Sequence, residues 1–459
     1  MQSKKTAILG AGISGLATAF YLKKLGFEVS VFEKFDRPGG QILSVKESDY
    51  LLDKGAFSGI ETTGLIPQLV EELKLTESFI YAGEKANRKQ VRINGRLFEI
   101  SMNPENLFKF PLFTFRSKFR FFIEPFIPRT RKGARLAVAE FIKKRLGDEF
   151  LSYIIEPFSS EVYAGDTSKL SIEAAYPKLF SLEQQYGSVI KGFKKAPLQQ
   201  PVSDKFEGSG RLFSFTDGME TLTSALGKNL GYRVNFLNEI QKIEKNVKGG
   251  YSLLINRKGE IKREDFDLIV SALPAYTLAD AIQGLSDGTS QTLRRVEYVP
   301  LVQAHVAYLK SDLGETLKGY TVLIPAVEKK EVLNITPVSE FFTGRCPEER
   351  ILFSVIMGGA KHPDVIGMEP DNLKKIAINT IKEIYKAKDK PVFVSLKSLK
   401  KAVPQYNTDY YDVLQKIAAF EAENPGLFIT GNFLGGVSIG DSILSSFKTA
   451  ERVARQFPQ

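Results

Sequence analysis

Residues 6–15 read TAILGAGISG, a short apolar run that is followed by glycines at positions 10, 12 and 15. The apolar run predicts a strand, and apolar side chains at helical spacing predict a helix over residues 12–25. A second apolar run predicts a strand over residues 28–32, which ends at Glu33. Together these elements form a β-α-β unit of about 30 residues, the setting in which this glycine spacing indicates a bound dinucleotide.

Each glycine of this motif has a physical reason. Gly10 makes the tight turn, Gly12 lets the main chain approach a pyrophosphate, and Gly15 lets helix and strand pack closely. The helix N-terminus offers free N–H groups and a positive dipole end to the phosphates. Glu33 follows Gly15 by 18 residues, where a carboxylate can accept hydrogen bonds from both ribose hydroxyls of an adenosine. The motif indicates a dinucleotide but does not distinguish FAD from NAD.

The composition limits the chemistry that side chains can supply. The chain has 459 residues, more than the ~250–300 at which single cores stop growing, so two or three domains are expected. Its one cysteine, Cys346, cannot form an internal disulfide, and its two histidines, His305 and His362, are too few for a His-rich metal site. We expect no metal, a core position for His305 and a surface loop for His362. An enzyme of this composition takes its reactivity from a cofactor.

The C-terminal end of the chain carries a second strand–glycine–helix unit. Residues 427–431 predict a strand that ends at glycine, and residues 437–456 predict a helix. Between the two ends, strand-rich and helix-rich stretches alternate without a repeat period. This order predicts one nucleotide-binding domain that is built from separate segments, with other lobes inserted.

Two further glycine-bearing turns follow the first unit, RPGG at residues 37–40 and DKGA at residues 53–56. Taken alone, the first of them would be an ordinary loop. Together with both terminal units, these residues resemble the FAD-containing amine-oxidase/desaturase superfamily. The resemblance implies FAD as the cofactor and a helix near residue 437 whose N-terminus faces the developing negative charge of the flavin. Monoamine oxidases of this superfamily attach the flavin through a cysteine near the C-terminus. Because Cys346 lies far upstream, non-covalent FAD is expected.

The same resemblance assigns cofactor contacts by position. It places Glu33 at the ribose and Ile240 beside the adenine, although a plain core residue of a strand is an equal interpretation of Ile240. The expected FAD-binding residues are Gly10, Gly12, Ile13, Ser14, Gly15, Glu33, Lys34, Gly40, Gly55, Ala56, Phe57, Ser58, Ile240, Gly431, Asn432, Val437, Ser438 and Ile439.

Motifs in the middle of the chain resemble one family of this superfamily, the protoporphyrinogen oxidases. The matches run in order from residue 6 to about residue 455 and include EPF at 156–158, VYAGD at 162–166, YGSVI at 186–190, DGM at 217–219 and GYTVLIP at 319–325. The family implies oxidation of protoporphyrinogen IX to protoporphyrin IX in heme biosynthesis, with six electrons leaving in three hydride transfers to FAD. Molecular oxygen then takes up the electrons and gives hydrogen peroxide.

Other activities of the superfamily stay open as alternatives. Coproporphyrinogen III, with four propionates instead of two, is a rival substrate that favours a more basic and more open pocket. A different desaturase or an amine oxidase is a second alternative, but the chain lacks the tryptophan that such amine oxidases carry near the C-terminus. A flavin-bearing scaffold without turnover is a third. No catalytic acid or base is assigned, because the flavin carries the reaction.

Three residues are expected at the substrate. Arg88 precedes a hairpin that is predicted over residues 91–100 by its Asn-Gly turn, and the resemblance places this arginine near a substrate carboxylate. The alternative for Arg88 is a solvated loop charge. Leu317 and Leu333 flank the GYTVLIP segment, and the resemblance has them sandwich the macrocycle. Plain core leucines are the somewhat favoured alternative for this pair.

A basic, phenylalanine-rich stretch carries much of the net charge of +10. Residues 107–135 hold eight basic residues and one acid, and residues 108–126 hold eight phenylalanines. Phenylalanine rings can enter a lipid headgroup boundary while lysine and arginine meet anionic lipid, so a membrane surface is one interpretation. A helical lobe whose phenylalanines form its own core is an equal one, and both can hold for different faces. Nucleic acid is not expected, because no nucleic-acid motif accompanies the stretch.

The sequence as a whole predicts an α/β (α+β) multi-lobe fold. We expect a Rossmann-like FAD-binding domain over residues 1–85, 210–275 and 405–459. A mixed-sheet substrate-binding domain is expected over residues 86–104, 160–209 and 276–404. A helical, basic membrane-binding lobe is expected over residues 105–159. The expected partners are a tetrapyrrole substrate, molecular oxygen, a membrane surface, ferrochelatase and a second copy of the chain. Because the sequence shows neither a spanning segment nor a signal peptide, we expect a cytoplasmic protein that lies peripherally on the cytoplasmic membrane.

Overall fold

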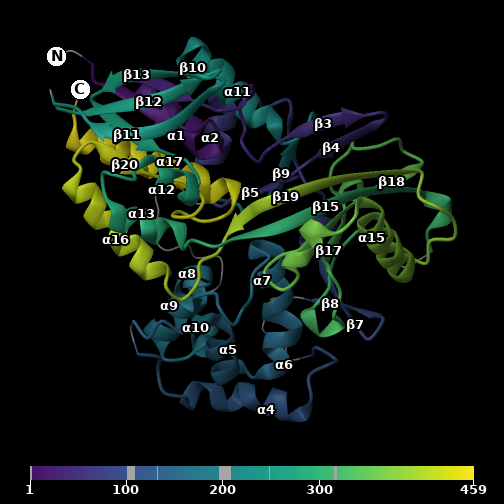
Figure 1. The fold of residues 1–459 in the computed structure, drawn as a ribbon. Coiled ribbons are helices and arrows are strands. Elements are labelled where there is room, and N and C mark those ends of the chain that lie inside the picture. Colours follow the sequence, from purple (N-terminus) through teal and green to yellow (C-terminus); the bar gives the residue numbers. More distant parts are fainter. Residues whose placement is uncertain are drawn as a thin grey trace. The chain divides into compact units, whose positions relative to one another are not determined.

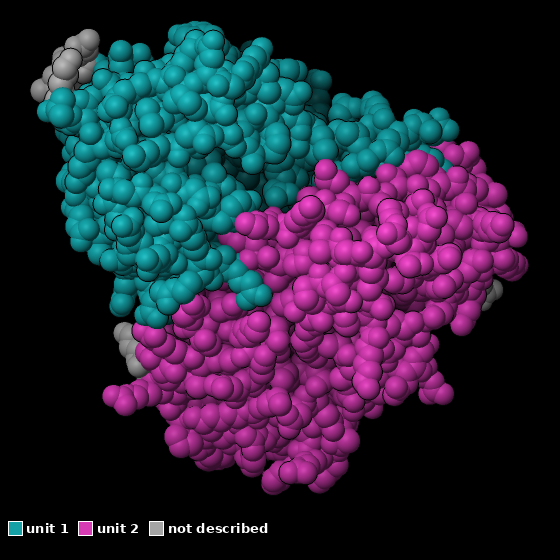
Figure 2. Space-filling view, in the orientation of Figure 1, with its two compact units in different colours: residues 1–81, 206–297, 411–459 teal, residues 82–205, 298–410 magenta. Residues whose placement is uncertain are grey.

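The structure is a computed structural model that describes residues 3–100, 109–131, 133–195, 208–247, 249–314 and 318–458. The chain divides into two compact units, which Figure 2 colours separately. Unit 1 comprises Met1–Tyr81, Phe206–Glu297 and Tyr411–Gln459, and unit 2 comprises Ala82–Lys205 and Tyr298–Tyr410. Each unit is therefore assembled from segments that are distant in the sequence.

A five-stranded parallel sheet lies in unit 1, with the strand order β10-β2-β1-β14-β20. The strands span, in that order, Val234–Asn235, Glu28–Phe32, Lys5–Leu9, Leu268–Ser271 and Leu427–Ile429. In the register of the sheet, Thr6 of β1 lies opposite Val29 on one side and Leu268 on the other. Strands β1, β14 and β20 are buried along almost their whole length, which is why their sequences are continuous apolar runs.

Helix α1 (Ile13–Lys24) packs against α11 (Glu220–Leu230) and α17 (Ile439–Gln456), and Figure 1 shows α1 and α17 together. Ile8, Val31 and Val270, from three neighbouring strands, share one buried core with Leu16 and Phe20 of α1. This packing holds the first turn of α1 at the end of β1.

The remaining elements of unit 1 surround this core. Strand β3 (Ser44–Glu47) pairs with β4 (Tyr50–Asp53). Two small sheets consist of β5 (Gly59–Ile60), β9 (Leu212–Phe215) and β6 (Phe79–Tyr81), and of β11 (Asn238–Lys245), β12 (Tyr251–Arg257) and β13 (Glu260–Phe266). The other helices are α2 (Leu65–Glu72), η4 (Gly231–Arg233), α12 (Ala275–Ala281), α13 (Asp287–Arg294) and α16 (Tyr410–Glu423).

A seven-stranded mixed sheet lies in unit 2, with the order β19-β15-β18-β17-β16-β7-β8. The strands span, in that order, Phe393–Pro404, Tyr298–Leu309, Arg350–Gly358, Val332–Pro337, Thr321–Leu323, Lys89–Ile93 and Arg96–Ile100. Helix α15 (Pro370–Tyr385) packs on β15, β17 and β19. Strands β7 and β8 form the hairpin that Asn94-Gly95 predicted, and Asn94 has the left-handed backbone that such a turn needs.

The helical part of unit 2 runs from residue 115 to residue 195. It contains α4 (Phe115–Ile123), η2 (Glu124–Phe126), α5 (Val138–Leu146), α6 (Asp148–Phe150), the π-helical turn η3 (Leu151–Ile155), α7 (Glu156–Tyr163), α8 (Ile172–Ala175), α9 (Pro177–Tyr186) and α10 (Val189–Lys195). Short helices of unit 2 outside this part are η1 (Glu84–Asn87), η5 (Lys310–Asp312), η6 (Ala326–Glu328), α14 (Val338–Phe341) and η7 (Pro363–Gly367). Within the described ranges, no helix is both long and apolar enough to cross a membrane.

The compact units differ from the expected division at several boundaries. Residues 276–297, expected in the substrate-binding domain, belong to unit 1, because α12 packs against α13 and β11. Residues 105–159, expected as a separate lobe, belong to unit 2, because α7 packs against β16 and β17. Residues 82–85 and 405–410 belong to unit 2 instead of the FAD-binding domain.

Candidate functional site

The sequence motifs of unit 1 meet at one edge of its parallel sheet. Strands β1, β2, β14 and β20 end at Leu9, Phe32, Ser271 and Ile429. Because the strands are parallel, the loops that follow them lie at the same edge, which is where open α/β sheets bind nucleotides. The loop after β14 was not expected to take part, yet the Ala272 carbonyl oxygen lies 3.4 Å from the position of a Cβ added at Gly10.

The three glycines of the N-terminal motif have different surroundings. Gly10 has a φ of +96°, which favours glycine, and a Cβ on Gly15 would overlap the Gly10 carbonyl oxygen. Gly12 has ordinary extended backbone, with φ −72° and ψ 177°. A Cβ on Gly12 would meet no described heavy atom within 4 Å. The main chain at Gly12 therefore faces open space, as a close approach by a ligand requires.

The first turn of α1 is free to bind an anion. Gly12 caps α1 without a side-chain hydrogen bond, and the described first turn contains no acidic residue. The Ser14 carbonyl accepts a hydrogen bond from Ser446 Oγ of α17 at 2.9 Å, while Ile13 is half-buried. The N–H groups of this turn and the positive end of the helix dipole are thus available to phosphate. A pyrophosphate fits this turn and the open space at Gly12.

Glu33 is buried and its carboxylate is held by main-chain donors. Oε2 accepts from Ala11 N at 2.8 Å and Oε1 accepts from Phe35 N at 3.0 Å. A carboxylate has about four acceptor positions, so capacity remains for ribose hydroxyls. The next residue, Lys34, is exposed, and its ammonium lies 4.9 Å from the centroid of the Phe35 ring.

A main-chain hydrogen bond joins Glu33 to the start of β11, the strand that carries Ile240. Asn238 N donates to the Glu33 carbonyl oxygen at 2.8 Å, and Ile240 follows two residues later on β11, at a bulge before Lys242. The side chain is 8% exposed. Ile240 is thus buried on its strand, and the adenine beside it stays a proposal.

The loop at residues 37–42 is held by a residue that sequence reasoning missed. The Arg37 guanidinium donates to the carbonyl oxygens of Pro38, Gly40 and Ile42 at 2.9 to 3.0 Å. Gly39 N donates to the Ala11 carbonyl oxygen at 2.8 Å, so the loop lies directly beside the N-terminal motif. A Cβ on Gly40 would lie 3.2 Å from Gly12 Cα, which shows how closely the two glycine-bearing turns approach.

Arg37 belongs to a larger polar cluster. It faces the Glu220 carboxylate of α11 at 3.7 Å, and Glu220 accepts from Ser44 N at 2.9 Å. Asp53, 3% exposed, accepts from Ser44 Oγ at 2.6 Å and from Met219 N at 2.9 Å. Asp53, from the DKGA turn, is therefore a structural residue that ties β3 and β4 to the start of α11.

The rest of the DKGA turn follows Asp53. A Cβ on Gly55, whose φ is +151°, would overlap the Gln41 carbonyl oxygen, so this turn packs on the 37–42 loop. Ala56 is exposed, and Phe57 and Ser58 are half-buried. The two glycine-bearing turns and the N-terminal motif thus form one continuous main-chain surface.

The C-terminal unit contributes a second helix N-terminus. Gly431 has a φ of +130°, and Asn432 and Val437 are half-buried in the loop that leads to α17. Ser438 Oγ caps α17 by accepting from Asp441 N at 3.0 Å, and Ile439 is buried. Unlike α1, this helix carries its own cap and an acid in its first turn, so its N–H groups are partly satisfied.

Two of the three expected substrate residues can be placed in unit 2. Arg88 is exposed, and its Nη1 donates to the Tyr320 hydroxyl at 3.2 Å and faces Glu99 at 3.8 Å. The hydrogen bond that Arg88 donates to Tyr320 and the nearby negative charge of Glu99 raise the pKa of Arg88 further. Leu317 lies outside the described residues.

Leu333 lies at the other end of β16 from Arg88. Its carbonyl oxygen accepts from Ile324 N at 2.9 Å, and its side chain, 7% exposed, packs with Ala164 and Val299. Leu333 also lines a cavity of about 10 Å³, which holds no more than about one water. The described part of unit 2 thus does not bring Arg88 and Leu333 together.

Among the residues described, no group of three or more His, Cys, Asp or Glu side chains is arranged to hold a metal ion. His305 is 2% exposed on β15, as expected of a core histidine. His362 is half-buried in the loop before η7, where a loop was expected, and it lines the cavity beside Leu333.

The phenylalanine-rich stretch has a buried and an exposed set of rings. Phe110, Phe113 and Phe121 are 4% exposed, and the Phe113 ring lies 5.1 and 5.6 Å from the centroids of the other two. Phe115, Phe119 and Phe122 are largely exposed and recur at the i, i+4 and i+7 spacing of one face of α4. Phe126, in the following turn η2, is also largely exposed. The stretch therefore combines a small buried core with an uncovered apolar stripe, and contact of this stripe with a membrane stays a proposal.

A buried ion cluster lies at the C-terminal end of α4. Arg145, Glu124 and Glu183 are all 0% exposed. Arg145 faces Glu124 at 3.1 Å and pairs with Glu183, and Glu124 accepts from Val189 N at 3.0 Å. The cluster links the end of α4 to α5, α9 and α10.

Comparison with known proteins connects the site with a family. The family described as flavin containing amine oxidoreductase matches residues 13–454. The chain is 29% identical over 480 residues to protoporphyrinogen oxidase 2, chloroplastic/mitochondrial, of Arabidopsis thaliana, covering 99% of this chain and 94% of the relative. It is 24% identical over 460 residues to coproporphyrinogen III oxidase of Bacillus subtilis (strain 168), covering 96% of each.

Solved structures show the same fold. A crystal structure from Exiguobacterium sp. 255-15 has a TM-score of 0.82 at 20% identity and covers 100% of both chains. Reduced UDP-galactopyranose mutase has a TM-score of 0.75 at 15% identity, covering 100% of this chain and 97% of that one. The family match covers nearly the whole chain, and the glycine-bearing turns fit its cofactor. The chain belongs to the flavin-containing amine oxidoreductase family and is an FAD-dependent oxidoreductase.

Proposed function

We propose that this protein oxidises protoporphyrinogen IX to protoporphyrin IX in heme biosynthesis. The observation that carries the proposal is the full-length similarity to the Arabidopsis thaliana enzyme, which covers 99% of this chain. When bound, FAD would supply the oxidising chemistry: three hydrides would leave the macrocycle for the flavin, and molecular oxygen would take up each electron pair with two protons as hydrogen peroxide.

In this proposal the glycine-bearing turns of unit 1 bind FAD without a covalent bond. The main chain at Gly12 and the first turn of α1 hold the pyrophosphate, and Glu33 holds the ribose. Arg37 keeps the loop with Gly40 against Gly12, so the cofactor meets a preformed surface. The other proposed FAD contacts are Gly10, Ile13, Ser14, Gly15, Lys34, Gly55, Ala56, Phe57, Ser58, Ile240, Gly431, Asn432, Val437, Ser438 and Ile439.

The chain's own residues bind and orient the substrate. Arg88 is a permanent cation, and it holds a substrate carboxylate. The Tyr320 hydroxyl, 3.2 Å from Arg88 Nη1, fixes the direction of the guanidinium. Leu333 and Leu317 are proposed to contact the apolar macrocycle.

Coproporphyrinogen III is the second candidate substrate, and the full-length similarity to the Bacillus subtilis enzyme favours it. The two substrates differ in the number of propionates, four against two. Lys85 and Lys89 beside Arg88 are already paired with Glu340 and Glu161, so they add little free positive charge. This charge balance supports the substrate with fewer propionates.

A rate comparison tests the proposal. Purified protein with FAD receives protoporphyrinogen IX or coproporphyrinogen III, while porphyrin fluorescence, oxygen uptake and peroxide are recorded. Protoporphyrinogen IX is expected to react faster. Retained FAD without any fluorescent product from either substrate would contradict a porphyrinogen oxidase. Arg88→Met is expected to raise KM and leave kcat nearly unchanged, whereas Arg96→Met, an exposed arginine of the same hairpin, leaves both unchanged.

We further propose that the exposed phenylalanine stripe docks on the cytoplasmic membrane, which makes this a peripheral cytoplasmic protein. Phe115 and Phe126 are 85% and 84% exposed, and the Lys191 ammonium lies 5.9 Å from the Phe126 ring. Apolar rings beside basic side chains match an anionic lipid surface. Ferrochelatase, which would take up the product, and a second copy of the chain stay proposed partners.

Vesicle binding tests the membrane proposal. The double variant F119S/F122S is expected to lose sedimentation with vesicles of phosphatidylglycerol and phosphatidylcholine, because it removes rings that are 55% and 66% exposed. Ile261→Ser is a matched control, since Ile261 is 59% exposed on β13 of unit 1. Equal sedimentation of the double variant and the wild type would refute docking by this stripe.

A further inference from the structure

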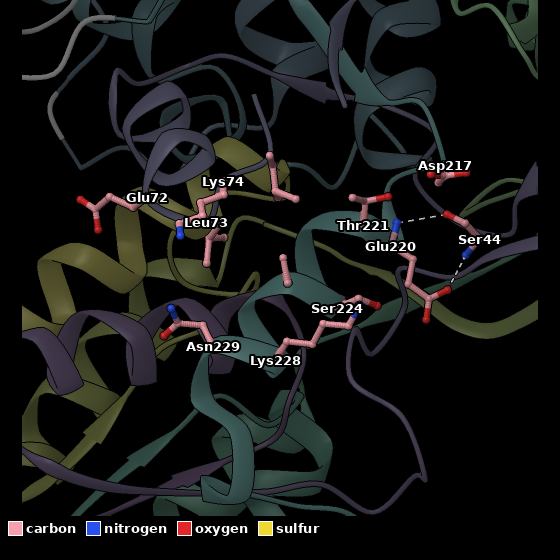
Figure 3. A pocket seen from close by; sticks show the side chains of 12 residues that line it. Ser44, Glu72, Leu73, Lys74, Asp217, Glu220, Thr221, Ser224, Lys228 and Asn229 are labelled. Atoms are coloured by element: carbon pink, nitrogen blue, oxygen red, sulfur yellow. Dashed lines mark hydrogen bonds between the residues drawn. The ribbon is translucent and has the colours of Figure 1, made fainter. Parts of the chain in front are cut away.

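A cavity of unit 1 is lined by none of the residues that we propose for FAD. It has a volume of about 630 Å³ and runs between residues 72–75, at the end of α2, and one face of α11 (Figure 3). This volume is within the ~300–1,000 Å³ of small-molecule pockets. The cavity therefore has room for a metabolite of its own.

One wall of the cavity is a polar face of α11. Its residues recur at i, i+3, i+4, i+7 and i+8, which places them on one side of a helix: Thr221, Ser224, Ala225, Lys228 and Asn229. Leu73 and Leu75 add apolar surface on the opposite wall. Figure 3 shows the Lys228 side chain extending along α11 toward Ser224. Hydroxyls, an amide and an ammonium thus line one side of the same space.

The acids of the cavity are already engaged by cations outside it. Glu72 pairs with Lys24 at 2.6 Å, Asp217 faces Lys46 at 3.5 Å, and Glu220 faces Arg37 at 3.7 Å. Each of these three acids therefore has a cation beside it.

Its two lysines, in contrast, have no acidic or hydrogen-bonding partner among the described residues. Lys74 follows α2 in the left-handed backbone region, and Lys228 lies in the last turn of α11. Two uncompensated ammonium groups beside hydroxyl donors favour a bound anion, because each ammonium offers three N–H donors and a full charge.

From this arrangement we propose that the cavity binds a small metabolite with an oxyanion group, phosphate or carboxylate, and that binding changes the affinity for FAD. The second half rests on the FAD site proposed above. Glu220 lines the cavity and faces Arg37, whose guanidinium holds the carbonyl oxygens of the 37–42 loop. That loop lies beside Gly12 through Gly39 N and the Ala11 carbonyl oxygen. A ligand beside Glu220 thus biases the loop that meets the cofactor, and the coupling is reciprocal.

Calorimetry on the FAD-saturated protein tests the binding, because bound FAD occupies the glycine-bearing turns. Inorganic pyrophosphate and citrate are titrated separately and distinguish a phosphate from a carboxylate ligand. Binding of at least one of them is expected, weakened about tenfold by Lys228→Met or Lys74→Met. Lys375→Met, an exposed lysine on α15 of unit 2, serves as control and leaves binding unchanged. No binding of either anion, or binding that both cavity variants leave unchanged, overturns the proposal.

Titration of the FAD-free protein with FAD tests the coupling. A saturating amount of the bound anion is expected to shift the FAD dissociation constant at least threefold, and Lys228→Met is expected to remove the shift. An unchanged dissociation constant refutes the coupling. A shift that persists in Lys228→Met reflects competition at the glycine-bearing turns and refutes it equally. Absence of FAD binding in the wild type would contradict the proposed FAD site. Anion binding in the cavity would still be supported or overturned by the calorimetry alone.

Discussion

Replacing Gly12 by valine separates cofactor binding from folding. Gly12 has ordinary extended backbone at φ −72° and ψ 177°, which valine adopts readily. A Cβ there meets no described heavy atom within 4 Å, so the fold has space for the new side chain. That space is where we place the pyrophosphate, and the added methyl groups would displace it from the first turn of α1.

The expected size of the two effects differs strongly. Replacing glycine by a residue that cannot cap costs a helix at most about 1 kcal/mol. A hydrogen bond to a charged group contributes about 1.5–3 kcal/mol. If Ile13 N and Ser14 N each donate one to the proposed pyrophosphate, losing both costs about 3–6 kcal/mol of binding. This corresponds to FAD binding that is weaker by about 10² to 10⁴.

The assay measures both quantities on one protein. Quenching of flavin fluorescence gives the FAD dissociation constant, and thermal unfolding of the FAD-free protein gives its stability. Gly83→Val is the matched control, because Gly83 also precedes a helix, has φ −60° and ψ 163°, and would place its Cβ in open space. FAD affinity of the folded Gly12→Val protein within threefold of the wild type would refute the reasoning. If valine prevents folding, Gly12→Ala repeats the test with a smaller side chain.

Three further perturbations test the packing described above. Gly15→Ala is expected to lower the melting temperature of the FAD-free protein, because its Cβ would overlap the Gly10 carbonyl oxygen; unchanged melting would contradict this contact. Arg145→Met leaves Glu124 and Glu183 buried without their cation. Urea unfolding is expected to show a free energy of unfolding that is lower by about 3–5 kcal/mol. Arg129→Met, at an exposed arginine, is the control and should lower it far less. Burial raises the pKa of Tyr176 to about 12, so the folded protein keeps a proton that the unfolded chain loses above pH 10. Stability should therefore fall between pH 10 and about 12, and Tyr176→Phe should make this fall shallower in alkaline urea titrations; an identical slope would argue against it.

Sequence reasoning recovered the parts of the site that depend on the main chain. The spacing of Gly10, Gly12 and Gly15 is a demand of backbone geometry, and it can be read without any knowledge of the surroundings. Glu33 could be found because it ends the strand that follows the helix. The hairpin at Asn94-Gly95 was equally predictable, since its turn needs positive φ.

The parts that depend on long-range contact could not be read in the same way. Arg37 and Glu220 are separated by 183 residues, and nothing in either local sequence indicates that they face each other. Arg88 and Tyr320 meet because β7 pairs in parallel with β16, a pairing between distant segments. Residues 276–297 lie in unit 1 and not with the expected substrate-binding segments for the same reason, since α12 packs on β11.

The phenylalanine-rich stretch shows what helical spacing adds to composition. Eight phenylalanines in 108–126 are compatible with a core or with a membrane surface, and their number alone does not say which rings are buried. The structure divides them by face, with Phe121 inside and Phe119 and Phe122 outside. Leaving four such rings exposed forgoes about 6–12 kcal/mol of burial, at about 1.5–3 kcal/mol for each ring. The ion cluster around Arg145 links Glu124, which follows α4, to α5 and α9. An exposed apolar stripe beside basic side chains is better explained by a contact that buries it than by folding alone.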